Sequence, residues 1–285
     1  NWNTSGAGSS FMKGASTVTM VGAAKALQIL NSANGFNNLT ITGSVTQATA
    51  IDVSGMLSIT GTLTTAGYSI TGGAALDLSS GGTLVGTTSS ISVGSVRMND
   101  VSSNRLTLTT GALSVSGSWD TSGASSVLTL GTSTATLTGA TGTIALGVGQ
   151  TLANVLITGA YTLSSPITVS SLTISAGGLI KGTNALTVTG SLTLSGGFLT
   201  SASGVVAIGG SVTISSASSY IAFGSETWTV SGSWTNASTS GSWSPGTGGI
   251  TFNSTSPETM TFAGANLPGP EFNTVLFSGA SSVTF

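Results

Sequence analysis

The chain has 285 residues, of which only 4% are charged, against about a quarter in ordinary globular proteins. Its net charge of −2 argues against a basic surface that would bind nucleic acid. Because it has no histidine and no cysteine, disulfides, thiol nucleophiles and ordinary zinc sites are excluded. No stretch approaches the ~20 apolar residues of a membrane span, and an apolar fraction of 39% argues against disorder. We therefore expect a folded protein with a neutral surface of hydroxyl groups, no cofactor and no bound metal.

Two phrases recur along the chain in the same order. The first reads W-N-T-S-G-A-G at 2–8, W-D-T-S-G-A-S at 119–125 and W-T-N-A-S-T-S-G at 234–241. The second reads F-N-N-L-T-I-T-G at 36–43, L-A-N-V-L-I-T-G at 152–159 and F-N-T-V-L-F-S-G at 272–279. This spacing predicts one continuous solenoid built of long repeats at 1–117, 118–232 and, in part, 233–285. The repeat landmarks, which we expect to serve packing, are Trp2, Trp119, Trp234, Gly43, Gly159 and Gly279.

Short strand patterns fill the chain between these phrases. Segments such as L-S-I-T-G (57–61), L-T-L-T-T-G (106–111) and L-T-V-T-G (186–190) alternate branched apolar residues with threonine or serine and close on glycine. This alternation places apolar side chains on one face of a strand and hydroxyls on the other. The best helical candidate, 23–30, falls where the other repeats show strand and turn patterns, so it too is predicted to be a strand.

Strands this short, with no helices between them, fit either an antiparallel sandwich or barrel, or a parallel β-helix. Hairpin signals such as Asn-Gly are nearly absent, and similar strand phrases begin at Leu39, Leu57, Leu76 and Val96. The sequence therefore favours an all-β, right-handed parallel β-helix of about 18–22 residues per coil, forming an elongated rod.

The segment S-G-S-W-T-N-A-S-T-S-G-S-W-S-P-G-T-G-G-I-T-F-N-S-T at 231–255, followed by E-F-N-T-V-L-F at 271–277, resembles a repeat of large secreted bacterial and archaeal surface proteins. Those proteins resemble the filamentous-haemagglutinin and autotransporter-adhesin class of parallel β-helices. The resemblance implies a cell-surface or extracellular structural role and carries over no catalytic residue.

Groups for acid–base catalysis are scarce and scattered. The seven acids are Asp52, Asp77, Asp100, Asp120, Glu226, Glu258 and Glu271. Acids about one coil apart could be aligned by stacking, but without histidine or cysteine no nucleophilic triad can form, and we expect no enzymatic activity.

The densest charge lies between Arg97 and Arg105 and includes Asp100 and Asn104. One interpretation is a polar contact to a neighbouring subunit, through Arg97, Asp100 and Arg105, or a weak cation site formed by Asp100 and Asn104. The simpler interpretation, which we favour, is an exposed loop with one local ion pair.

Three further patterns permit weaker expectations. Thr-x-Thr triplets recur at uneven spacing and suit an uncharged strand surface better than an ice-binding face. One tryptophan per repeat is more typical of packing at a coil corner than of a sugar-stacking platform. Sites for N-linked glycosylation occur at Asn3, Asn38, Asn236 and Asn253.

Neither end of the sequence shows an obvious cap, and 282–285 is expected to be an unfinished strand. We therefore expect head-to-tail stacking onto a second copy or continuation into a longer chain, with Val283 and Phe285 at the contact. The predicted function is that of a non-catalytic extracellular protein of a surface filament. The alternatives are an adhesin stalk that displays a binding tip elsewhere and, less favoured, an ice- or glycan-binding solenoid. The expected partner is the chain itself, with a surface glycan as a second candidate.

Overall fold

The computed structural model describes most of the chain, and of Trp243, Val283 and Thr284 only the backbone. The described residues are 1–4, 6, 11–29, 35–237, 243–262, 272–278 and 283–284. They form 35 strands and no helix, so within these ranges no helix could cross a membrane.

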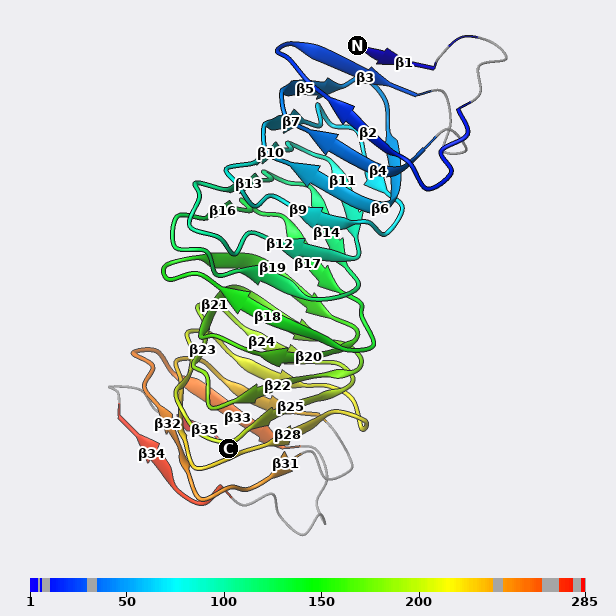
Figure 1. The fold of residues 1–285 in the computed structure, drawn as a ribbon. Helices are drawn as coiled ribbons and strands as arrows, with labels where there is room; N and C mark the ends of the chain where they lie inside the picture. The colour runs from blue at the N-terminus through cyan, green and yellow to red at the C-terminus, as the bar shows by residue number, and fades with distance from the viewer. Residues whose placement is uncertain are drawn as a thin grey trace. The chain divides into compact units, whose positions relative to one another are not determined.

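The fold is a parallel β-solenoid, as the sequence predicted. The described strands stack in about 11 turns, and the strand pairs described below are parallel, each joining a strand to its counterpart one turn away (Figure 1). Turn length varies more than expected, since the short turn that brings Leu39 opposite Leu57 contrasts with the much longer one that brings Trp234 opposite Met260. The predicted range of coil lengths is therefore too narrow, because some turns carry longer loops.

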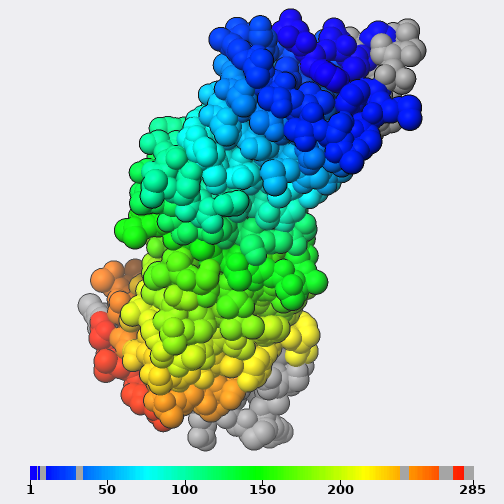
Figure 2. Space-filling view, viewed as in Figure 1, coloured from blue at the N-terminus to red at the C-terminus, as the bar shows by residue number. Residues whose placement is uncertain are grey.

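By their internal contacts the residues form two compact units. Unit 1 comprises 1–136 and 145–153, and unit 2 comprises 137–144 and 154–285. Within each unit, neighbouring bands of the surface come from neighbouring stretches of the chain (Figure 2).

Unit 1 has three faces, which we name A, B and C. Face A contains β1 (Trp2–Asn3), β3 (Lys25–Gln28), β5 (Ser44–Gln47), β7 (Thr62–Thr64), β10 (Thr83–Val85), β13 (Arg105–Thr107) and β16 (Val127–Thr129). Face B contains β2 (Thr17–Met20), β4 (Phe36–Ile41), the second half of β6 (Ile51–Ile59), β9 (Ala75–Asp77), β12 (Ser95–Arg97) and β15 (Trp119–Thr121). Face C contains the first half of β6, β8 (Ile70–Thr71), β11 (Ser90–Val93) and β14 (Ala112–Val115). β3 confirms that 23–30 contains a strand.

Unit 2 has three rows of strands. The first is β20 (Ala160–Leu163), β22 (Gly178–Gly182), β25 (Phe198–Ser201), β28 (Tyr220–Ala222) and β31 (Trp243–Ser244). The second is the start of β21 (Ile167–Ile174), then β23 (Leu186–Val188), β26 (Val206–Ile208), β29 (Thr227–Val230), β32 (Gly249–Phe252) and β34 (Val275–Phe277). The third is the end of β21, then β24 (Leu192–Leu194), β27 (Val212–Ile214), β30 (Trp234–Asn236), β33 (Glu258–Phe262) and β35 (Val283–Thr284). Three strands divide between the units: β17 (Thr134–Leu137), β18 (Gly142–Leu146) and β19 (Thr151–Ile157).

The interior is filled by ladders of like residues. On face A the inward positions Val45, Leu63, Leu84 and Leu106 lie opposite one another in successive turns, and all four are fully buried. Burying one such side chain contributes roughly 1.5–3 kcal/mol. Because successive turns bury similar side chains, stability increases by comparable steps from turn to turn.

Glycines at the corners allow the turns to stack closely. A Cβ atom on Gly43 would lie 2.0 Å from the carbonyl oxygen of Gly22, and one on Gly61 would lie 2.1 Å from that of Gly43. No side chain fits between these backbones. The T-G that closes the strand phrases is thus needed for contact between turns.

Copies of the same phrase do not stack on one another. In unit 1, Trp2 lies on face A and Trp119 on face B. The chain makes five steps along face A, from β1 to β13, and then adds β14 and β15 before it reaches Trp119. Since this interval is not a whole number of turns, equivalent phrases fall on different faces.

Candidate functional site

The predicted charged cluster forms a ladder on the outside of face B. Arg97 lies opposite Asp77 in the turn before it and Asp120 in the turn after it. Its Nη1 is 3.7 Å from Asp77 Oδ2, and its Nε donates to Asn99 Oδ1 at 3.0 Å, while Asn99 Nδ2 donates to Asp120 Oδ2 at 2.9 Å. The ion pair therefore joins two adjacent turns, and the predicted local ion pair within one exposed loop is wrong. Because it is exposed, it contributes at most about 1 kcal/mol.

Asp100 organises the neighbouring corner loop. Its carboxylate accepts hydrogen bonds from Asn104 Nδ2 and from the backbone N–H groups of Ser80 and Ser102. The hydrogen bond from Asn104, followed by those from the two serines, outweighs desolvation and lowers the pKa of Asp100. Asn104 is fully buried, and its Oδ1 accepts from Gly81 N at 2.8 Å. These contacts show that Asp100 and Asn104 hold the corner loop in its conformation. In the described ranges no group of three acidic side chains suited to a metal occurs.

Arg105 lies apart from this brace. It is exposed at the start of β13, opposite Thr83 and Val127 on face A. The structure thus brings Arg97, Asp77 and Asp120 together, and Asp100 with Asn104, but does not gather all the predicted residues into one site.

A glutamine that the sequence did not single out braces the next turns of the same corner. Gln150 Nε2 donates to the carbonyls of Thr121 and Ser126, at 3.0 Å each, and Thr121 Oγ1 donates to Gln150 Oε1 at 2.6 Å. These partners belong to an earlier turn of the chain. They could have been predicted only if the number of residues in each turn were known.

Unit 2 contains a buried lysine at a corner between its first two rows. Lys181 is fully buried, and its Nζ donates to the carbonyl of Asn184 at 2.6 Å and to that of Ser203 in the next turn. Burial lowers the pKa of Lys181, and the charge of nearby Glu226 partly offsets this effect.

Glu226 is the acidic partner in this corner and is also buried. Its Oε1 accepts from Trp228 Nε1 at 2.8 Å and from Gly224 N at 3.2 Å. Desolvation raises its pKa, but hydrogen bonds, led by that of Trp228, outweigh desolvation and leave the pKa below its ordinary value. Glu226 is therefore charged at neutral pH inside the solenoid.

Within a repeat, the first phrase contacts the second phrase that follows it in the chain. Trp2 and Phe36 lie with ring centroids 5.7 Å apart, and Trp234 and Phe272 at 5.4 Å, edge to face in both cases. Phe36 and Phe272 begin the second phrase, and the middle copy has Leu152 at that place. Trp119 and Trp234 are fully buried, and Trp2 is partly buried. Such pairs contribute about 0.5–1.5 kcal/mol beyond the area that they bury.

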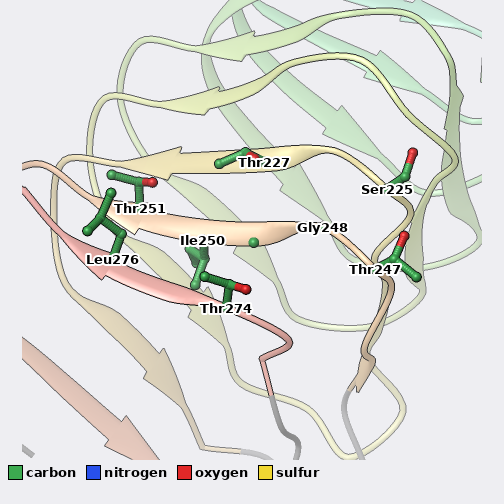
Figure 3. A pocket seen from close by; sticks show the side chains of 9 residues that line it. Ser225, Thr227, Thr247, Gly248, Ile250, Thr251, Thr274 and Leu276 are labelled. Carbon is green, nitrogen blue, oxygen red and sulfur yellow. The ribbon is translucent and has the colours of Figure 1, made fainter.

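A notch lined mostly by serine, threonine and glycine lies on the outside of unit 2, over β29, β32 and β34 (Figure 3). Its volume is about 340 Å³. The lining residues are Ser225, Thr227, Thr247, Gly248, Gly249, Ile250, Thr251, Thr274 and Leu276. It forms where Gly249 interrupts an outward row of side chains from successive turns. It was not predicted, because the sequence does not show which residues of different turns are neighbours.

β34 continues the second row of unit 2 but is poorly covered. Val275 and Phe277 lie opposite Ile250 and Phe252, which are each 1% exposed, yet they are themselves 38% and 43% exposed. Leu276 is 55% exposed on the outer side. Of the expected contact residues, Val283 lies in β35 opposite Glu258, while Phe285 and the landmark Gly279 lie outside the described residues.

The third row of unit 2 carries an unbroken outward threonine ladder. It consists of Thr173, Thr193, Thr213, Thr235 and Thr261, each opposite the next. Among the sites for glycosylation, Asn3 and Asn253 are exposed, Asn38 is partly buried and Asn236 is buried.

Comparisons with protein families, with curated proteins and with solved structures find no match to this chain.

Proposed function

We propose that this chain is a non-catalytic structural protein of the cell surface or extracellular space, and that it forms part of a filament built by end-to-end stacking of solenoid turns. The observation that supports this most is the state of β34. Its inward side chains, Val275 and Phe277, remain exposed where their counterparts one turn earlier are buried. A further turn in the same register would bury them and extend the hydrogen bonds of β34.

The composition supports the same proposal. A solenoid gains stability turn by turn, and a surface of serine and threonine with few lysines and arginines offers few sites to trypsin-like proteases. The resemblance to the filamentous-haemagglutinin and autotransporter-adhesin class is consistent with an extracellular location, and we extend it to this chain as part of the proposal.

Electron microscopy of the purified chain tests the proposal. We expect open-ended fibres, and we expect Val275→Asp to abolish them while the circular dichroism spectrum stays that of a β protein, because a carboxylate cannot be buried at the contact without a partner. Thr213→Asp, in the middle of the threonine ladder, is the matched control and should still form fibres. Discrete monomers of the unmodified chain would contradict a filament and favour the adhesin stalk.

A further inference from the structure

We propose that the notch beside Gly249 binds one unit of a neutral carbohydrate. This binding activity would be separate from assembly, because the notch faces outward from the second row of unit 2 (Figure 3).

The notch exists because one outward side chain is missing. Thr227 lies opposite Gly249, and Thr274 follows in the next turn, directly before the pair Ile250 and Val275. A Cβ atom on Gly249 would lie 3.2 Å from Thr274 Cβ, so even a methyl group would begin to fill this space. The remaining volume of about 340 Å³ is at the lower end of small-molecule sites.

The lining selects for uncharged, hydroxyl-rich ligands. Ser225, Thr227, Thr247, Thr251 and Thr274 line the notch, and none of its described lining residues is charged. Within the described part of the chain, no hydrogen bond engages the hydroxyls of Thr227, Thr251 or Thr274, which leaves them available as donors and acceptors.

One side of the notch is apolar, which suits the carbon-bound hydrogens of a sugar ring. Leu276 supplies this side and is more than half exposed. A charged ligand would find no counter-ion among the described lining residues, and a wholly apolar ligand would leave the threonine hydroxyls without partners. The threonine ladder of the third row has the same hydroxyls, but no glycine interrupts it between Thr173 and Thr261, and we assign it no ligand.

The test is equilibrium dialysis of the whole chain against radiolabelled cellobiose and against radiolabelled N,N′-diacetylchitobiose, a measurement that works for fibres as well as for monomers. We expect one of these neutral probes to bind at one site per chain. Gly249→Thr fills the notch and should weaken binding at least about 10-fold. Ala207→Thr adds the same side chain in the same row, opposite Thr229, and should leave binding unchanged.

Thr227→Val provides a second variant, because it removes one hydroxyl with little change of volume and should weaken binding several-fold. The proposal is overturned if neither neutral probe binds, if Gly249→Thr and Thr227→Val bind as well as the unmodified chain, or if glucuronic acid binds as tightly as the neutral sugars.

Discussion

Replacement of Gly159 by alanine will destabilise unit 2 by about 4 kcal/mol or more, or prevent it from folding. The added Cβ would lie 1.8 Å from the carbonyl oxygen of Gly139, in the adjacent turn. Neither backbone can move aside without breaking its own hydrogen bonds, since Ala160 N donates to that same oxygen at 3.0 Å. Urea unfolding followed by far-ultraviolet circular dichroism measures the effect.

The matched control is Gly149→Ala. Gly149 has a φ of +79°, but its Cβ would meet nothing within 4 Å, so the substitution should cost only the ~1 kcal/mol of a left-handed backbone. Equal effects of the two substitutions would show that the turns are not in backbone contact at Gly159.

Replacement of Lys181 by methionine will destabilise the protein by about 3–5 kcal/mol, although a buried charge is removed. The carbonyls of Asn184 and Ser203 lose their donor, and the buried carboxylate of Glu226 loses its only nearby cation among the described residues. The double variant Lys181→Met with Glu226→Gln should cost less than the sum of the single variants, because the two groups interact. Strict additivity would contradict that interaction.

The same lysine makes stability depend on pH. Its pKa in the folded protein lies below the ordinary value of 10.5. Between these two pKa values the unfolded chain binds more protons than the folded chain, so the free energy of unfolding rises with pH in this window. In Lys181→Met this rise should disappear, and an unchanged profile would show that Lys181 is solvated.

Much of the fold could be predicted from local patterns. Period-two alternation identified the inward residues of segments such as 57–61 and 186–190, and the near absence of hairpin signals distinguished parallel stacking from a sandwich. The variable loop length could not be predicted, because loops tolerate insertions at little energetic cost.

The sites were harder to predict, because stacking brings together residues about one turn apart. Period two alone places Lys181 inside, since it is the next position but one after the inward Leu179, but its acceptors lie at corners that the sequence does not align. The contact of Trp234 with Phe272 and the notch at Gly249 likewise depend on which turns are adjacent.

Disulfide formation between engineered cysteines tests the parallel register most directly, because the chain has no cysteine of its own. Thr193 and Thr213 lie opposite each other on the outside of adjacent turns, and neighbouring strands are about 4.8 Å apart. The variant with cysteines at 193 and 213 should form an intramolecular disulfide rapidly on mild oxidation. The variant with cysteines at 193 and 212 should not, because Val212 points into the interior. Efficient bonding in the second variant and none in the first would contradict a parallel, in-register solenoid.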